Sequence, residues 1–277
     1  MIRIDGRTAE EIIVERLEEF ARDHPGGTPP SEGTPPSEGT PDSSGAPGPG
    51  TTGFSIEDRA DRFVLHNVPY ENGLSAISWS KELLDGGERH TQVEWAQQTA
   101  HEEFHVPPGP VYGATICVLH EHRDVGDPRQ RDLVNRVKNI FKKDFATEKP
   151  MTSTRLVWTP AGPEEVYHWQ GYPNASRRDS DLVGLEGYIC PGFENFTDAL
   201  LGIRDVTKLE QAVTWLTGKR PYAWRFDQQP TQREERVLLL GCRVDNFLIS
   251  SFGIVNYYRP ARGVVVRAGA SSGAGGA

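Results

Sequence analysis

The amino-acid sequence predicts an α+β fold for a chain of 277 residues. Two observations carry this prediction. Residues 111–145 have the pattern of a strand followed by an amphipathic helix, and from residue 152 onward a hairpin and two short helices precede a run of short strands. The composition, 36% apolar and 25% charged, is typical of a globular protein that can bury a core.

The first element is an amphipathic N-terminal helix within residues 1–23. Thr8 and Glu11 have the spacing of a capping box, and apolar side chains then recur at helical spacing at Ile12, Ile13, Leu17 and Phe20. A helix over residues 8–22 is too short to be stable alone. We therefore expect its apolar stripe to dock on the rest of the chain, on a second copy, or on a partner.

A low-complexity spacer follows over residues 24–53. The hexapeptide GTPPSE occurs at 27–32 and again at 33–38, and GTPDSS follows at 39–44. Proline keeps such a segment extended, and it has too few apolar residues to offset the entropy of ordering. The sequence predicts a disordered Pro/Gly/Ser/Thr linker between the helix and the body of the protein.

Residues 54–150 form an α/β region of unknown type and role. Residues 61–66 and 111–120 are predicted strands, the second almost continuously apolar, as an interior strand would be. An amphipathic helix is expected over residues 130–145, with apolar side chains at Leu133, Val137, Ile140 and Phe141.

Residues 151–267 are predicted to form a second domain. Residues 152–160 and 164–172 read as a hairpin, and two helices follow over 196–203 and 207–217. Thr207 and Glu210 fit a capping box, and Gly218 ends the second helix. Short strands follow from Tyr222, with irregular chain over 250–262, and residues 268–277 are expected to be a flexible tail.

The charge distribution argues against nucleic acid as a partner. The net charge is −9, of which residues 1–23 and 24–53 contribute −3 each, so the remainder carries only −3 and shows no basic stripe. No apolar run approaches the roughly 18 residues that a membrane span needs, and no signal peptide is visible. We expect a cytoplasmic protein with no membrane span.

Three cysteines, Cys117, Cys190 and Cys242, are an odd number without CxxC spacing. This pattern indicates neither a disulfide framework nor a structural zinc site, so buried thiols are expected.

One segment matches a catalytic metal motif. His101, Glu102 and His105 have the HExxH spacing, in which two histidines one helical turn apart bind zinc and the glutamate acts as a base. His120 and His122 could add ligands. Against this, Glu103 puts a charge where such a helix is normally uncharged, and Pro107–Pro108 ends the helix at once. A zinc-dependent hydrolase is therefore kept as the alternative function of the chain. The competing interpretation of this segment is a polar helix end without metal. We expect no cofactor.

Other catalytic signatures are absent: the sequence contains no GxSxG, no Walker A loop and no GxGxxG after a strand. The more informative segment lies between the apolar runs 237–240 and 264–266. It is rich in Tyr, Ser and Asn, which are typical of adaptable binding surfaces. The candidate ligand-binding residues are Arg243, Asp245, Asn246, Ser250, Ser251, Asn256, Tyr257 and Tyr258.

The order of elements over residues 152–267 resembles the variable proteins that diversity-generating retroelements target, in particular those with a C-type lectin-like fold. The resemblance rests on the hairpin, the two helices, the aromatic strand PYAWR at 221–225, the polar segment, and the closing RPARGVVVR at 259–267. There is no catalytic signature to compare.

The resemblance implies that adenine-directed mutagenesis rewrites codons in the polar segment while the scaffold stays fixed. Asn246 and Asn256 are what unedited AAY codons would encode. The scaffold would be held by apolar residues such as Leu209, Val213, Leu216, Trp224 and Val265. The implied function is a ligand-binding protein that recognises a variable macromolecular target, with the N-terminal helix joining it to another component.

Overall fold

The computed structural model describes residues 3–4, 7–8, 53–71, 73–99, 102–158, 160, 164–168, 181–226, 228–253 and 262–268. The chain divides into two units, Met1–Gly48 and Pro49–Ala277. In the first, β1 (Arg3–Ile4) and β2 (Arg7–Thr8) pair in antiparallel fashion. The rest of the predicted helix over 8–22, and the predicted linker up to residue 52, lie outside the described residues.

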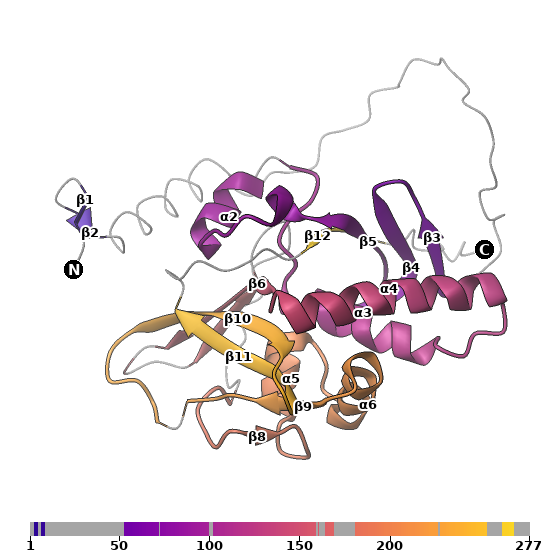
Figure 1. The fold of residues 1–277 in the computed structure, drawn as a ribbon. Helices are drawn as coiled ribbons and strands as arrows, with labels where there is room; N and C mark the ends of the chain where they lie inside the picture. The colour runs from indigo at the N-terminus through magenta and orange to yellow at the C-terminus, as the bar shows by residue number, and fades with distance from the viewer. Residues whose placement is uncertain are drawn as a thin grey trace, which may run out of the picture. The chain divides into compact units, whose positions relative to one another are not determined.

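Two sheets organise the second unit (Figure 1). One sheet has the order β12-β5-β4-β3, formed by Arg262–Ala268, Gly73–Leu83, Arg62–Tyr70 and Ser55–Asp58. The other has the order β7-β6-β10-β11-β9-β8, formed by Glu165–His168, Met151–Trp158, Glu234–Cys242, Asn246–Gly253, Arg220–Ala223 and Gly187–Tyr188. The neighbouring strands pair in antiparallel fashion except β11 and β9, which are parallel.

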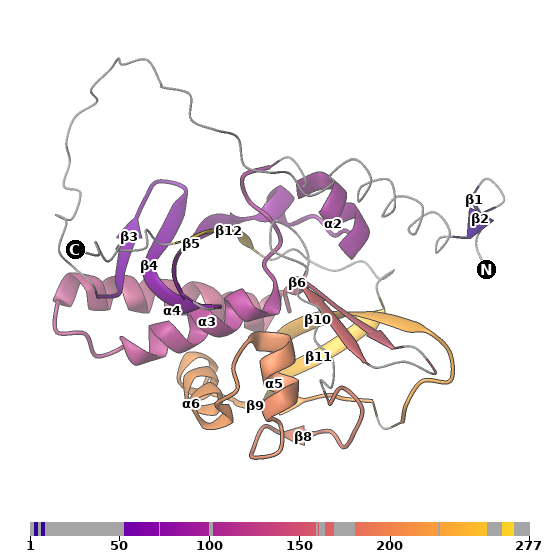
Figure 2. The same ribbon diagram turned by 180° about the vertical axis from the view of Figure 1, so that it is seen from behind.

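The helices lie between and beside these sheets. They are η1 (Leu84–Gly87), α2 (Gln92–Gln98), α3 (Gly109–Glu121), α4 (Pro128–Thr147), α5 (Glu194–Leu201) and α6 (Val206–Thr217). Both α3 and α4 contact strands of the two sheets, and Figure 2 shows the pair from behind. None of the helices in the described ranges is long and apolar enough to span a membrane. The prediction of a mixed α+β fold is confirmed.

Most predicted elements are present. The strand predicted at 61–66 is the first part of β4, the helix predicted at 130–145 is α4, and the hairpin is formed by β6 and β7. The helices predicted at 196–203 and 207–217 are α5 and α6, and Gly218 ends α6 in the left-handed conformation. The cap differs: Asp205, not Thr207, accepts a hydrogen bond from a backbone N–H, that of Lys208, at 2.9 Å.

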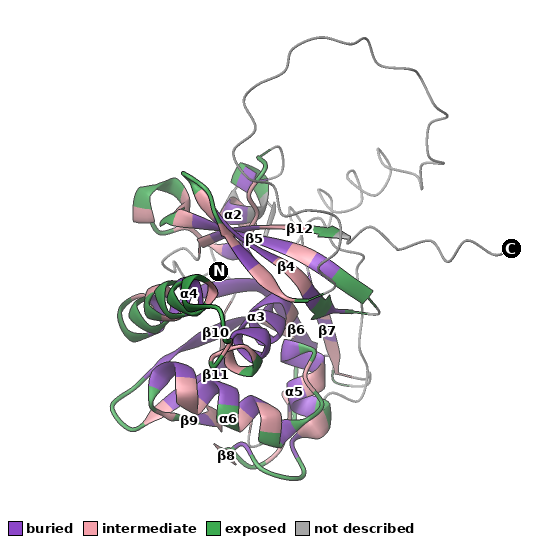
Figure 3. Cartoon of the chain, turned by 90° about the vertical axis from the view of Figure 1, so that its right-hand side faces the viewer, coloured by how far each residue is buried: buried purple, intermediate pink, exposed green. Residues whose placement is uncertain are grey.

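The prediction of a strand over residues 111–120 is wrong, because this segment is helix α3. Ten residues of α3 are buried, from Gly109 and Val111 to Leu119, so the helix has no polar face that would reveal its 3.6-residue period. Figure 3 shows the contrast between α3, largely buried, and α4, which exposes one side. A short apolar run without that period cannot be distinguished from a buried strand by its sequence.

Two glycines let α3 pack closely on α5. A β-carbon at Gly109 would overlap the carbonyl oxygen of Leu200, and a β-carbon at Gly113 would overlap that of Leu201. We expect Gly113→Ala to destabilise the protein by about 1–3 kcal/mol, because overpacking against the backbone outweighs the better helix propensity of alanine. Thermal melts should show this, with Gly126→Ala, whose β-carbon meets nothing within 4 Å, leaving the melting temperature unchanged. Equal melting temperatures for the two variants would contradict the close approach of α3 and α5.

A column of aromatic side chains connects the two sheets through α3 and α4. Trp79 of β5 packs against Tyr112 and Phe141, with ring centroids 5.0 and 4.8 Å apart. Phe145, one turn further along α4, packs against Phe247 of β11 at 5.1 Å. One hydrophobic core therefore includes residues from both sheets.

The last strand also connects the two predicted regions. The strand predicted at 264–266 is β12, and it pairs with β5 in the sheet of residues 54–83, not with β10 or β11. The Arg262 side chain reaches Asp144 of α4, with Nε 2.6 Å from one carboxylate oxygen and Nη2 3.1 Å from the other. The predicted regions 54–150 and 151–267 thus share a sheet and a core. Ala268, assigned to the tail, ends β12, and residues 269–277 lie outside the described residues.

Candidate functional site

The structure separates the described binding candidates into two groups, one at each end of β11 (Asn246–Gly253). Arg243 and Asp245 lie in the turn between β10 and β11, where the backbone N–H of Arg243 donates to the carbonyl of Asn246 at 2.8 Å, and both are exposed. Asn246 begins β11 and is partly buried, whereas Ser250 and Ser251 lie near its other end. The remaining candidates, Asn256, Tyr257 and Tyr258, lie outside the described residues.

Part of the segment predicted to be irregular is regular strand. Residues 250–253 belong to β11, an interior strand between β10 and β9, and Ser250 is only 4% exposed. Ser250 therefore does not belong to an exposed surface. The sequence obscured this last part of the strand because serine and glycine, at Ser250, Ser251 and Gly253, are typical of turns and loops.

The register of the sheet defines which residues share a face. Phe247 and Ile249 pack in the main core, so alternation places Asn246, Leu248, Ser250 and Phe252 on the opposite face of β11. Leu248 pairs with Tyr222 of β9, and Tyr222 pairs with Tyr188 of β8. The side chains of Tyr188, Tyr222, Trp224 and Phe252 form what we call the aromatic face.

Trp224 is the most informative residue of the aromatic face. The prediction that it belongs to the core is wrong, because Trp224 is 40% exposed. The guanidinium carbon of Arg243 lies 5.0 Å from the centre of its ring, and Phe252 packs edge-on at 5.7 Å. A tryptophan held in this way stays in place while part of its surface faces solvent.

A second arginine covers the other end of the aromatic face. Arg220 lies over the ring of Tyr188 at 4.8 Å and pairs with Glu210 at 2.7 Å. Tyr188, itself 40% exposed, packs edge-on against Tyr222 at 5.3 Å. Partial burial and a hydrogen bond to Glu186 raise the pKa of Tyr222, so its hydroxyl stays protonated at neutral pH.

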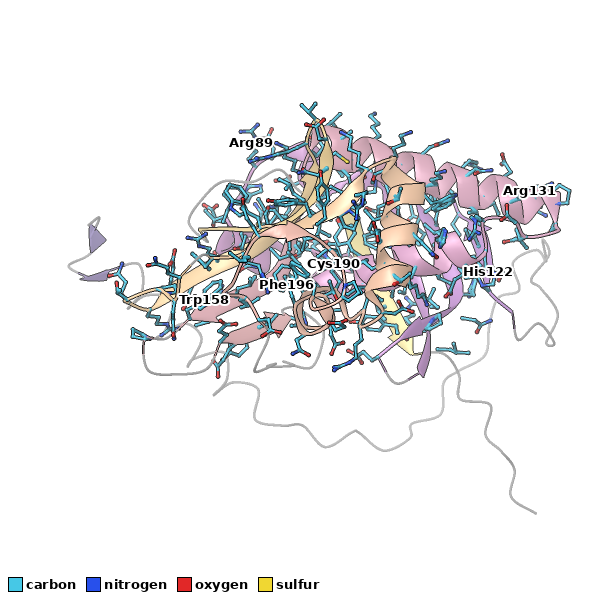
Figure 4. All side chains as sticks on the ribbon, turned by 90° about the horizontal axis from the view of Figure 1, so that it is seen from below. Arg89, His122, Arg131, Trp158, Cys190 and Phe196 are labelled. Carbon is cyan, nitrogen blue, oxygen red and sulfur yellow. The ribbon has the colours of Figure 1, made fainter. Side chains whose placement is uncertain are left out.

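A hollow of about 230 Å³ lies at the end of β11 beside Trp224. It is lined by Trp224, Arg225, Phe226, Arg236, Ser251 and Phe252. Arg236 lies over the ring of Phe226 at 3.7 Å and pairs with Glu234, and Phe226 packs edge-on against Trp158, labelled in Figure 4. The wall of the hollow is therefore anchored in the core.

Arg225 fixes the loop next to this hollow. It donates to the backbone carbonyls of Leu185 and Asp181 at 2.9 and 3.1 Å, and it lies over the ring of Phe193. Burial lowers its pKa, an effect that nearby carboxylates oppose. The guanidinium thus holds the chain before β8 in place.

The described residues of the zinc motif, Glu102–His105, do not form a helix. Glu102–His105 run through a bend into a single bridge, in which His105 and Val264 exchange backbone hydrogen bonds of 2.9 and 3.1 Å. The carboxylate of Glu103 pairs with Arg62 at 2.6 Å. His101 lies outside the described residues. The zinc interpretation required two histidines on one helical turn, and the described part of the segment, Glu102–His105, does not form that turn.

The other two candidate zinc ligands, His120 and His122, pack against aromatic rings. His122 follows α3, not a strand, and stacks on Phe54 with ring centroids 4.5 Å apart, while His120 packs beside Trp215 at 5.7 Å. In the part of the chain that the structure describes, no group of three or more His, Cys, Asp or Glu side chains could hold a metal ion.

The three cysteines differ in accessibility. Cys117 and Cys242 are buried as predicted, and burial raises the pKa of Cys117 to about 12 and raises that of Cys242. Cys190, labelled in Figure 4, is exposed, which corrects the prediction of three buried thiols. Its position directly after β8 and before α5 leaves its side chain outside the core.

Thiol titration should reflect this difference. We expect Ellman's reagent to detect one thiol per native chain, because only an accessible thiolate reacts, and all three in denaturant. Cys190→Ser should abolish the native signal. A native count of two or three would show that the interior around α3 or β10 opens readily.

Sequence reasoning missed most of the aromatic face. It assigned Trp224 to the scaffold, although Tyr222 lies two positions earlier in the predicted aromatic strand and alternation would put both on one face. That alternation was a usable signal. In the structure β9 ends at Ala223, and Trp224 continues its course by donating its backbone N–H to the carbonyl of Ile249 at 2.9 Å. Tyr188 gave no such signal, because only the strand order brings β8 into the same sheet as β11. The same holds for Arg236 of β10, which lines the hollow.

Comparison with known proteins yields no match to a family model, a curated protein or a solved structure.

Proposed function

We propose that this chain is a ligand-binding protein whose C-terminal surface recognises a variable macromolecular target, as a variable protein of a diversity-generating retroelement with a C-type lectin-like fold. The observation that carries the proposal is the exposed Trp224, fixed between Arg243 and Phe252 and next to the predicted residues of the β10–β11 turn. The N-terminal segment, residues 1–23, would join this surface to another component.

The chemistry of the aromatic face suits recognition of a protein. Tryptophan, tyrosine and arginine are the side chains most enriched among the residues that dominate binding energy at protein interfaces. Trp224 and Tyr188 each have an arginine over the ring, so little side-chain entropy remains to be lost when a partner binds.

The turn next to the aromatic face suits variation. Arg243, Val244 and Asp245 are exposed, and Val244 is 88% exposed, so substitutions there remove little buried contact. Phe247 and Ile249 on the adjoining strand are buried in the main core and would form the fixed scaffold.

The DNA beside the gene tests the retroelement proposal directly. We expect a reverse transcriptase gene and a near-copy of the codons for residues 240–267 that differs at adenines. Adenine differences should fall on codons of exposed residues such as Arg243 and Asp245, and spare those of Phe247 and Ile249. A neighbourhood without either element would overturn the retroelement assignment.

A display experiment tests the binding surface independently. A library that diversifies Arg243, Val244, Asp245 and Ser251 in the full chain is selected against lysozyme, with a control library at four exposed positions of α4, Arg131, Asp132, Asn135 and Asn139. We expect folded binders with dissociation constants of about 10 µM or below from the first library only. Equal yields from both libraries would contradict a specialised surface.

A further inference from the structure

The hollow beside Trp224 has a distinct chemistry within the proposed binding surface. Three of its six lining residues are aromatic, two are arginine, and none is acidic. Its volume, about 230 Å³, is below the roughly 300–1,000 Å³ of sites for drug-sized ligands and suits one or two side chains of a partner. The lining therefore favours an apolar group that has a negative charge next to it.

Hydrogen-bond donors on the lining residues are available for such a charge. Glu234 accepts from Nε and Nη2 of Arg236, at 3.0 and 2.7 Å. Within the described ranges, no protein group accepts from Nη1 of Arg236, from the hydroxyl of Ser251 or from the indole N–H of Trp224. Arg236 is 30% exposed, so its free edge can be reached from solvent.

We infer that the hollow is the anchor point for the partner, and that it takes a polypeptide segment in which a large apolar side chain adjoins a carboxylate. The apolar side chain would fill the space between Trp224, Phe226 and Phe252. The carboxylate would accept a charge-assisted hydrogen bond from Arg236. This inference rests on the proposed function, because it names the partner chemistry of the same surface.

A single-stranded nucleic acid fits the hollow less well, although it too combines flat apolar groups with negative charge. Base stacking needs open ring faces. Arg236 already lies over Phe226 at 3.7 Å and Arg243 lies over Trp224 at 5.0 Å. A base would therefore have to compete with an arginine for one face of each ring, whereas an aliphatic or aromatic side chain can also pack against ring edges.

Two matched dipeptides test the inference on the full chain. Acetyl-Phe-Asp-amide and acetyl-Phe-Asn-amide differ only in the charge of one side chain. Binding is followed by NMR at the indole N–H signal of Trp224, which Trp224→Phe identifies. We expect saturable shifts with the aspartyl peptide at millimolar concentrations, and affinity at least about fivefold lower for the asparaginyl peptide, because a charged acceptor strengthens the hydrogen bond.

Arg236→Gln should remove the preference for the aspartyl peptide, and Arg236→Lys should retain part of it. Arg59→Gln is the matched control, because Arg59 likewise pairs with a glutamate two residues away, Glu57, and does not line the hollow. Dispersed amide spectra of each variant confirm that it is folded.

Equal affinity for the two peptides, a preference that survives Arg236→Gln, or shifts away from Trp224 would overturn the inference. Stronger binding of adenosine monophosphate than of either peptide would assign the hollow to nucleotides instead. If the display library yields binders but neither peptide binds, the inference alone fails. If the aspartyl peptide binds as expected but the display library yields no binders, the inference about the hollow is supported and the proposal of a variable surface is contradicted.

Discussion

Trp79→Ala is expected to lower the free energy of unfolding by about 3–5 kcal/mol, because a tryptophan that is 1% exposed leaves a large cavity when it is truncated. The ring fills the junction of β5, α3 and α4, where it contacts Tyr112 and Phe141. Its indole N–H donates to the hydroxyl of Thr115 at 3.1 Å, so the mutation also leaves a buried hydroxyl without this partner. For a unit of this size the melting temperature should fall by roughly 6–20 °C.

Trp224→Ala is the matched control, since the same side chain is removed from a position that is 40% exposed. Its contacts with Arg243 and Phe252 are lost, but no closed cavity forms at this half-exposed position, and the cost should stay within about 1 kcal/mol. If Trp79→Ala does not fold, Trp79→Phe keeps most of the packing and should still melt below the parent. Similar losses at Trp79 and Trp224 would show that the aromatic face is part of the core.

The reliable predictions from the sequence were those in which a local pattern matches a local structure. Helices α4 and α6 each bury one stripe and expose the other, so their period is visible in the residues. Helix α3 is buried on all sides and offered only an apolar run, which favoured a strand. Gly109 and Gly113 allow its close contact with α5, but the residues around them in the sequence do not identify α5 as the partner.

The candidate site depended on information that the local sequence does not hold. The polar residues of the β10–β11 turn were identified as exposed from their chemistry, and Arg243 and Asp245 are exposed. That Arg243 reaches Trp224 follows only from the parallel pairing of β9 with β11, two strands separated by β10 in the chain. The strand order likewise puts Arg236 beside Ser251, which creates the hollow.

Strand β12 shows most clearly that the local sequence does not reveal which strands pair. Its apolar residues predicted a strand in the region 151–267, but its partner β5 lies about 180 residues earlier, in the region 54–150. Besides its backbone pairing with β5 and the buried side chain of Val264, β12 has a polar anchor: Arg262 donates to the carboxylate of Asp144 and to the backbone carbonyls of Ser80 and Lys81. This anchor is open to direct test.

Arg262→Ala is expected to cost about 3–5 kcal/mol, because it leaves the Asp144 carboxylate buried without its partner. The two side chains are only 11% and 8% exposed, and burial already raises the pKa of Asp144 against the opposing effect of Arg262. Arg267→Ala on the same strand removes an arginine that is 70% exposed and lies 3.5 Å from Glu103, so it should change stability by no more than about 0.5 kcal/mol.

Urea unfolding of the two single variants measures this difference, and a double variant separates the cause. Replacing both partners, as Arg262→Met with Asp144→Leu, removes the unpaired charge and should restore most of the stability that Arg262→Ala loses, since a buried ion pair can be exchanged for apolar residues of similar size. If the double variant is as unstable as the single one, the carbonyls of Ser80 and Lys81, and not the carboxylate, are what Arg262 stabilises. Equal midpoints for Arg262→Ala and Arg267→Ala would show that the pair does not hold β12 in place.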